Sequence, residues 1–324
     1  MNLTKKNILV MHPTDFGACA FYRYRFVAEI IQAKMKEELI VVVSPFEITD
    51  ERILKYTAAI SIGRPSPFVK NQVDMIRNYK RKRNRFGFRL FADYDDLLFD
   101  IGNDPSIPKW NDFPESTKVI GVFMRSELKD FDGVSVTTQF LKQQMHSVLG
   151  LNNVVILPNA VPTYAFGKSK RAPLESDIVK PRVLFAGAPQ HYMKDDAGDF
   201  GGVWYKWLQV AVANDEIEFH FFGYDCPEWL SDVKDKVVMH DVVNTLEFPS
   251  VIASIKPDIY LAPLDNNNFN KAKSNLKFLE ASAIGAALLC SSFDGAPYED
   301  DAHIMSKVPE DATVDDLRYV VSLI

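Results

Sequence analysis

The chain has 324 residues, of which 47% are hydrophobic and 25% are charged, and its formal net charge at pH 7 is −6. This composition excludes collagen-like, low-complexity and intrinsically disordered proteins, and the acidic balance argues against indiscriminate nucleic-acid binding by the whole molecule. The length exceeds the roughly 250–300 residues at which a single hydrophobic core stops growing, so we expect two domains. No apolar run reaches the roughly 20 residues of a membrane span, and no signal-peptide pattern opens the chain, so we expect a cytoplasmic protein.

The first half alternates short β-branched runs with stretches that are compatible with helices, the pattern of a parallel sheet covered by helices on both faces. The expected strands are residues 6–12, 38–44, 58–63, 88–95, 132–138 and 154–159. The expected helices are residues 21–36, 50–57, 115–131 and 139–149. This half is therefore predicted to be a doubly wound α/β domain.

A second series of the same kind follows a polar, proline-containing segment that has no periodicity. Its expected strands are residues 182–187, 218–223, 237–241, 258–264 and 286–292, and its expected helices are residues 203–213, 247–254, 274–284 and 317–324. We predict two Rossmann-like doubly wound domains, at residues 1–165 and 181–324, with a linker at residues 166–180. Ligands of open parallel sheets bind outside the carboxyl ends of the strands, so we expect the active site in a central cleft that both domains face.

Two loops between a strand and a helix have the composition of anion-binding sites. The first contains Gly17 and small residues, although it is not GxGxxG and a glycine there also serves the turn itself. In the second, Lys273, Ser274 and Asn275 lie at the start of a helix, where free backbone amides beside lysines suit a diphosphate. Glu280 of that helix is placed to accept hydrogen bonds from a ribose, and the alternative is a solvated helix charge.

The segment KSNLKFLEASAIGAALLCSS, residues 273–292, resembles the nucleotide-sugar motif of GT-B glycosyltransferases similar to glycosyltransferase family 4. The segments FGACAFYRYR, FADYDDLLFDI, DGVSVTTQFL and VVILPNAVP resemble pieces of these proteins in the same order. The resemblance covers most of the chain. It implies a GT-B fold and the transfer, with retention, of a hexosyl or pentosyl group from a nucleoside diphosphate, expected to be UDP, to a hydroxyl acceptor. It also implies that no cofactor and no metal is required, because helix amides and basic residues take the place of the ion.

The resemblance assigns donor-binding roles to individual residues. Glu280 matches the glutamate that binds the donor ribose, while Ser274 and Asn275 match the helix start that faces the phosphates. Gly17 matches the N-terminal glycine loop near the same phosphates.

Two lysines of the motif are expected to take part in the reaction, and one position departs from the family pattern. Lys273 or Lys277 is expected to neutralise charge on the departing diphosphate. The family usually has a second glutamate, eight residues before the first, and Ala272 stands at that position here. The contacts to the transferred sugar must therefore be partly different, and the sugar is not specified.

The loop FAGAPQHYMKDDAGDFGG follows the first strand of the second domain and corresponds to a loop that approaches the diphosphate in the resembled proteins. Gly187 is assigned to donor binding, and the catalytic basic group of this loop is expected to be His191 or Lys194. The ability of a histidine to titrate near neutrality favours a role for His191, and the alternative is that it is only a surface residue.

The acidic run Asp93-Tyr94-Asp95-Asp96 ends a predicted strand. Clustered carboxylates at a strand end suit Mg²⁺ or Mn²⁺, as in the DxD motif of GT-A glycosyltransferases. Because the two-domain pattern favours GT-B, we assign Asp93 or Asp95 to orienting or deprotonating the acceptor hydroxyl, the alternative being an acidic helix cap. Arg23 and Arg25 lie in the first predicted helix, and one interpretation is that they form surface ion pairs with Glu29.

A basic segment in the N-terminal domain has no acidic residue among its cations, which are Arg77, Lys80, Arg81, Lys82, Arg83, Arg85 and Arg89. Cations with interleaved aromatic residues favour contact with several phosphates. We therefore expect an acceptor of duplex DNA that contains hydroxymethylcytosine, as in phage enzymes that glycosylate this base. Three alternatives stay open: a simply solvated basic helix, a saccharide or glycolipid acceptor of cell-surface polysaccharide synthesis, and a non-catalytic binding module of GT-B shape.

Overall fold

The computed structural model describes residues 8–12, 17–34, 39–42, 57–82, 88–99, 115–167, 180–188, 191–192, 198–223, 225–298 and 305–324. The chain divides into two compact units. The first unit comprises Met1–Ala160 together with the short segment Lys271–Ser274, and the second comprises Val161–Asn270 and Asn275–Ile324. The predicted boundary at residue 165 falls inside a 3₁₀ helix, η6 (Thr163–Phe166), and most of the predicted linker lies outside the described residues. None of the helices in the described ranges has both the length and the hydropathy needed to cross a membrane.

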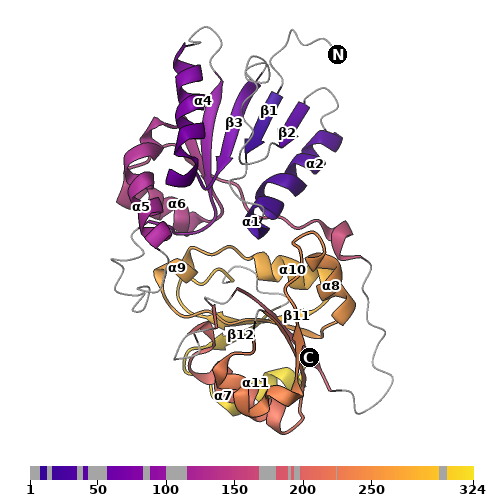
Figure 1. Ribbon diagram of the computed structural model, residues 1–324. Coiled ribbons are helices and arrows are strands. Elements are labelled where there is room, and N and C mark those ends of the chain that lie inside the picture. The colour runs from indigo at the N-terminus through magenta and orange to yellow at the C-terminus, as the bar shows by residue number, and fades with distance from the viewer. Residues whose placement is uncertain are drawn as a thin grey trace. The chain divides into compact units, whose positions relative to one another are not determined.

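The first unit is built on a parallel sheet with the strand order β2-β1-β3-β4-β5-β6 (Figure 1). Its strands are β1 (Ile8–His12), β2 (Leu39–Val42), β3 (Thr57–Gly63), β4 (Arg89–Tyr94), β5 (Gly133–Val136) and β6 (Val154–Ile156). Apolar side chains of β3, β4 and β5 lie in the core of this unit, where Ile60, Leu90 and Val136 are fully enclosed. The order changes direction between β1 and β3, so the carboxyl ends of these strands form the switch point where ligands of such sheets bind.

The helices of the first unit are α1 (Ala18–Ala20), α2 (Phe26–Lys34), α4 (Lys70–Lys82), α5 (Glu115–Glu127) and α6 (Gln139–Leu149). A π-helical turn, η1 (Phe21–Arg25), joins α1 to α2, so the helix predicted from residue 21 begins three residues earlier. Short 3₁₀ turns, η2 (Pro67–Val69) and η5 (Leu128–Asp130), flank α4 and α5. Of the helix predicted at residues 50–57, only Thr57 is described, and it begins β3 instead. The hydrophobic periodicity of the sequence did not predict the helix α4.

The second unit has the strand order β12-β11-β10-β7-β8-β9, the doubly wound order of a Rossmann fold. Its strands are β7 (Arg182–Ala186), β8 (Glu218–Phe222), β9 (Val237–His240), β10 (Ile259–Ala262), β11 (Ala287–Ser292) and β12 (Met305–Pro309). All are parallel. The sequence predicted the first five, whereas the edge strand β12 was not predicted. The direction of winding reverses between β7 and β10.

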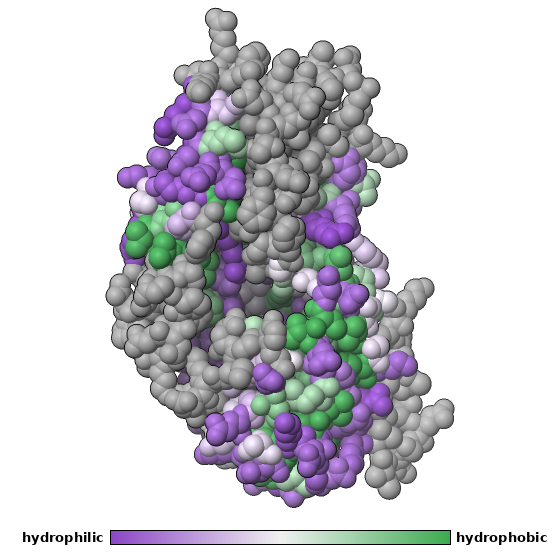
Figure 2. Space-filling model, in the orientation of Figure 1, coloured by the Kyte–Doolittle hydropathy of each residue, from purple (hydrophilic) through white to green (hydrophobic). Residues whose placement is uncertain are grey.

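Helices cover both faces of this second sheet (Figure 1). Alternate strand residues point to opposite faces, so Phe219 and Phe221 pack with one group of helices and Phe222 with the other. The first group is α7 (Val203–Ala213), η9 (Glu228–Lys236) and α11 (Val314–Ser322); the second is η6, α8 (Phe248–Ile255) and α10 (Leu276–Ile284). Hydrophobic residues also gather on the visible surface over α8 and α10 (Figure 2). The prediction of two Rossmann-like α/β domains is confirmed.

Candidate functional site

A buried carboxylate lies at the switch point of the second unit. Asp199, in the short turn η8 (Gly198–Phe200) after β7, is 6% exposed. It accepts hydrogen bonds from His191 Nδ1 at 2.6 Å, from Asn270 Nδ2 at 2.9 Å and from the Asp265 amide at 3.2 Å. Burial alone would raise the pKa of Asp199, but these hydrogen bonds, His191 first, hold it below its ordinary value. Asp199 is therefore charged at neutral pH and fixes the orientation of the His191 ring.

Close packing requires glycine at two positions after β7. A Cβ on Gly198, whose φ is +58°, would lie 2.6 Å from the His191 carbonyl oxygen. A Cβ on Gly187, directly after β7, would lie 2.6 Å from the Phe185 ring. His191 therefore packs against Gly198, whereas Lys194 lies outside the described residues. Asn270 was not predicted as a site residue, although an asparagine that follows a strand ending at the switch point is a sequence signal that could have indicated it.

Glu280 is one of the most enclosed charges of the second unit. It lies on α10 with 2% exposure and accepts hydrogen bonds from Tyr260 Oη of β10 at 3.0 Å and from Lys277 Nζ at 2.9 Å. Lys277 Nζ also lies 2.8 Å from Tyr260 Oη. The alternative that Glu280 is a solvated helix charge is wrong. The charge of Lys277 is correspondingly offset by Glu280 before any ligand binds.

The predicted phosphate-facing residues lie just before α10. Asn275 is the N-cap residue and the helix begins at Leu276, as the composition of the loop suggested. Within the first unit, Ser274 Oγ accepts a hydrogen bond of 2.7 Å from Asn159 Nδ2, and Lys273 Nζ lies 3.0 Å from Asp96 Oδ1.

Ala272, the position where the resembled family has a glutamate, is completely buried. Its carbonyl accepts a 3.1 Å hydrogen bond from Thr138 Oγ1. A buried alanine with its backbone oxygen engaged offers no side-chain group to a sugar at this position.

The acidic run at the end of β4 is bound by arginines of its own unit. Asp93, 4% exposed, pairs with Arg23 through Nε at 2.9 Å and through Nη2, and also accepts the Ser135 hydroxyl at 2.5 Å. Arg64 donates from Nε to Asp95 at 2.6 Å and from Nη2 to Asp96. The oxygens of these carboxylates already accept hydrogen bonds from the arginines, so the contacts favour a positioning role over proton abstraction. No group of three or more metal-ligating side chains occurs among the described residues.

Arg23 is the residue whose role the sequence analysis missed. The expected surface pair with Glu29 is made by Arg25 instead, at 3.7 Å with both side chains 57% exposed. Arg23 points inward from the π-helical turn and is 8% exposed. Its position between Tyr22 and Tyr24, both buried, is the sequence signal that could have indicated an enclosed arginine.

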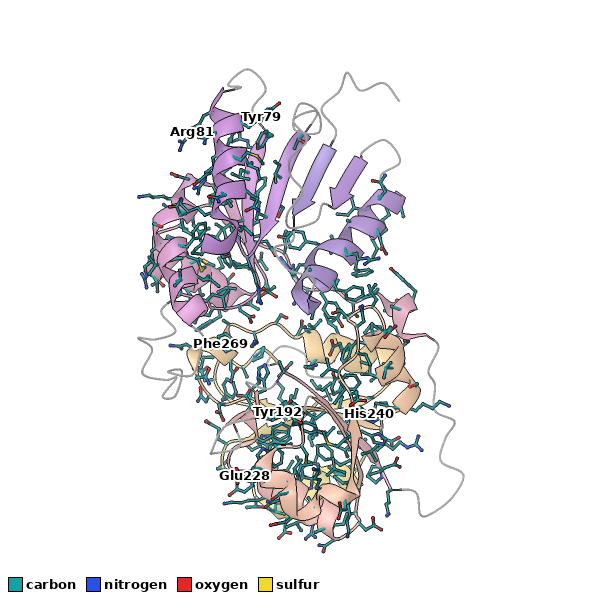
Figure 3. The ribbon with its side chains drawn as sticks, in the orientation of Figure 1. Tyr79, Arg81, Tyr192, Glu228, His240 and Phe269 are labelled. Carbon is teal, nitrogen blue, oxygen red and sulfur yellow. The ribbon has the colours of Figure 1, made fainter. Side chains whose placement is uncertain are left out.

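The basic segment does not present all of its cations to solvent. Arg77 is buried and donates to Glu127, at 2.5 Å to the carboxylate and 2.7 Å to the carbonyl, while Lys80 pairs with Asp132. The hydrogen bond with Arg77 holds the pKa of Glu127 below its ordinary value. Arg81 is exposed on α4, away from the side on which Tyr79 leaves the helix (Figure 3).

Arg77 and Lys80 therefore do not contribute unpaired charge to a phosphate-binding surface, because acidic residues distant in sequence neutralise them. Arg89 also lies near an acid, 3.4 Å from Asp132. The Lys82 side chain and Arg83 and Arg85 lie outside the described residues. Gly17 is exposed just before α1, and its carbonyl accepts a hydrogen bond from the Phe21 amide.

Comparison with known proteins gives a likeness of fold. No protein-family model and no curated protein sequence matches the chain. A solved structure of a mutant of S. aureus TarM, in complex with fondaparinux, alpha-GlcNAc-glycerol and UDP, matches with a TM-score of 0.50 and 10% identity, over 83% of this chain and 49% of that chain. A UDP-forming trehalose-phosphate synthase from Burkholderia xenovorans matches with a TM-score of 0.49 and 11% identity, over 82% and 66% of the two chains.

A third solved structure, a UDP-glucosyltransferase from Polygonum tinctorium, matches with a TM-score of 0.46 and 9% identity, over 97% and 88% of the two chains. The match to TarM covers only about half of the length of the TarM chain. The two parallel Rossmann-like sheets and the likeness to TarM define the fold as GT-B.

Proposed function

We propose that this protein is a glycosyltransferase that moves a sugar from a UDP-sugar to a hydroxyl acceptor. The observation that supports this most directly is the enclosed Glu280, held by Tyr260 and Lys277 near the start of α10 in a GT-B fold. A carboxylate fixed in this way is preorganised to accept hydrogen bonds from the ribose hydroxyls of a nucleotide. The UDP bound to the TarM structure supports uridine as the donor nucleoside.

The proposed chemistry is electrostatic. Cleavage of the bond between sugar and diphosphate leaves negative charge on the departing phosphate, and preorganised donors stabilise such charge as it develops. Backbone amides at Asn275 and the start of α10 supply one set of donors. His191 is proposed as a further polar group at the switch point, where the Asp199 carboxylate fixes its ring through Nδ1. Lys194 and Lys273 are proposed as further cations, no metal or cofactor is invoked, and retention is proposed from the resemblance to family 4 alone.

For the acceptor we propose a saccharide or glycolipid hydroxyl ahead of duplex DNA. A polyanion requires several unpaired cations on one surface, but Arg77 and Lys80 are already paired with acids. Duplex DNA that contains hydroxymethylcytosine is the second candidate, favoured by exposed Arg81 and by the charge of the whole segment 77–89.

The activity is tested by release of UDP from a panel of UDP-sugars, first without an acceptor and then with saccharide acceptors. Slow release without an acceptor and faster release with one is the expected result. A protein that binds UDP but releases none from any UDP-sugar would be a non-catalytic module, and the proposed activity would then be abandoned.

The acceptor class is tested by binding to a duplex with hydroxymethylcytosine across a salt series. The test variant is Arg81→Ala/Lys82→Ala/Arg83→Ala, and the control is Arg125→Ala/Lys129→Ala, which removes two exposed cations of the same unit. We expect weak binding with a shallow salt dependence in all three proteins. A steep dependence that only the test variant flattens would establish DNA as the acceptor.

A further inference from the structure

Arg23 is an enclosed guanidinium in the helical segment that runs from Ala18 to Lys34. It lies in the π-helical turn η1, between Tyr22 and Tyr24, each 3% exposed. Single π-helical turns are rare and occur frequently at functional sites. Here the turn directs Arg23 toward the carboxyl ends of β4 and β6, where its partners lie.

The guanidinium joins three segments of the first unit. Besides the two bonds to Asp93 at the end of β4, its Nη1 donates to the Leu157 carbonyl at 2.5 Å and to Asn159 Oδ1 at 3.2 Å, both just after β6. Asp93 is itself held by the Ser135 hydroxyl of β5. Because Arg23 cannot lose its proton and its five donors point in fixed directions, it defines the positions of these groups together.

The bond to Asn159 also determines how that amide is turned. A guanidinium only donates, so the atom of Asn159 that faces it must be Oδ1, and Nδ2 is directed to the other side. There Nδ2 donates to Ser274 Oγ at 2.7 Å. With a lone pair occupied by this bond, the Ser274 hydroxyl is left to donate its own proton elsewhere.

We propose that Arg23 is a positioning residue that acts through Asn159 to fix Ser274 as a hydrogen-bond donor toward a phosphate oxygen of the nucleotide. This inference rests on the proposed function, in which Ser274 lies beside the donor diphosphate. It assigns a role to the buried ion pair of Arg23 and Asp93, two residues that are far from Ser274 in the sequence. It also explains why Asp93 is bound by Arg23 instead of being available as a base.

The test is a double-mutant cycle of Asn159→Ala and Ser274→Ala, read by UDP binding and by amide hydrogen exchange of residues 271–274. Asn159→Ala is expected to weaken UDP binding about fivefold in the wild-type background, the effect of one hydrogen bond, but less than about twofold in the Ser274→Ala background. Exchange of residues 271–274 is expected to accelerate. The control is Asn153→Ala, which removes a different side-chain hydrogen bond of the same unit, the one from Asn153 Nδ2 to the Asp132 carbonyl.

Arg23→Lys extends the test to the guanidinium itself. It keeps a charge for Asp93, but its three donors cannot replace the four hydrogen bonds that the guanidinium makes to Asp93, Leu157 and Asn159, so it should reproduce the faster exchange at residues 271–274. Unchanged exchange in both Asn159→Ala and Arg23→Lys, or equal weakening of UDP binding in both backgrounds of the cycle, overturns the inference. Absence of UDP binding by the wild type would refute the proposed function separately, since the exchange measurement requires no nucleotide.

Discussion

At the scale of single residues, Glu280 and Asp93 are both enclosed, and each is stabilised by a cation of its own unit. A buried charge is tolerated only with such partners, and removal of one partner leaves the other uncompensated. Asp93 is bound on both oxygens by a bidentate guanidinium and a serine, whereas Glu280 accepts hydrogen bonds from Tyr260 and Lys277 through Oε2.

We expect Glu280→Gln to weaken UDP binding at least about tenfold while the fold is kept, because the amide retains the shape but is a weaker acceptor for ribose hydroxyls. Glu280→Ala should in addition lower the free energy of unfolding by about 1–3 kcal/mol, since Tyr260 and Lys277 lose their common partner. Calorimetric titration with UDP and urea unfolding measure the two effects. Glu247→Gln, an exposed carboxylate of the same unit, is the control, and UDP affinity unchanged in Glu280→Gln would contradict the assignment.

At the scale of elements, α6 shows how a helix end depends on one residue. Its N-cap is Thr138, whose hydroxyl accepts a hydrogen bond from the Leu141 amide at 3.2 Å, and its C-cap is Gly150 with φ +67°. A left-handed residue at this position lets the Gly150 amide bond to the His146 carbonyl at 3.0 Å. A Cβ on Gly150 would meet no atom within 4 Å, so only the backbone conformation opposes a side chain there.

Gly150→Ala is therefore expected to lower the free energy of unfolding by about 1 kcal/mol. Gly150→Asn should lower the free energy of unfolding clearly less, because asparagine adopts left-handed conformations more readily than alanine. Urea unfolding of the two variants beside the wild type provides the measurement. Equal losses in both would show that something other than the backbone conformation decides this position.

The edge of the second sheet contains a pair of stacked histidines, His220 of β8 and His240 of β9, whose ring centroids are 5.1 Å apart. His220 Nε2 lies 2.9 Å from Glu218, so that nitrogen carries the proton, and Nδ1 accepts from His240 Nε2 at 2.9 Å. Burial lowers the pKa of His220 against the opposing effect of Glu218, and Arg182 lowers it further. Burial and His220 likewise lower the pKa of His240, opposed by Asp241.

Because both pKa values are below the ordinary 6.5 in the folded state, the unfolded chain binds more protons as the pH falls below that value. Stability is thus complete above about pH 6.5 and decreases as the pH falls toward the folded-state values. Melting temperatures measured between about pH 7 and pH 5 should decline, and His240→Gln should flatten this decline. His146→Gln, at an exposed histidine of α6, should leave it unchanged; an identical slope in all three proteins would refute the role of the pair.

At the scale of the whole molecule, each unit has its own sheet and its own buried residues, so ligand binding to one unit can be followed separately. Three of the four tryptophans, Trp204, Trp207 and Trp229, lie in the second unit, which also contains Glu280. Tryptophan fluorescence therefore reports chiefly on the unit proposed to bind the nucleotide.

UDP at a concentration of about 100 times its Kd should stabilise the protein by about 2.7 kcal/mol and raise the temperature of the fluorescence transition by roughly 5–10 °C. The same addition to Glu280→Ala should raise it far less. Adenosine diphosphate serves as the control nucleotide, and an equal shift with both nucleotides would argue against uridine specificity.

Much of this architecture follows from local patterns. The alternation of apolar runs and helical stretches predicted five strands of the second sheet and the bounds of α6 and α7, because hydrophobic periodicity depends only on neighbours along the chain. The short residue sequence around Ser274 and Glu280 likewise indicated a polar loop followed by a helix. The π-helical turn was not predicted, since it differs from an α-helix in hydrogen bonding and not in composition.

Pairings between distant residues could not be read from the same patterns. Arg23 pairs with Asp93, 70 positions away, and Arg77 pairs with Glu127, 50 positions away. Arg23, which was expected at the surface, is therefore buried in an ion pair. The charge of Arg77, which was expected to contribute to a basic surface, is neutralised. Local composition states which charges a segment has. Which of these charges can contact a ligand depends on how the sheets bring distant segments together, because oppositely charged side chains that come into contact in the fold neutralise each other.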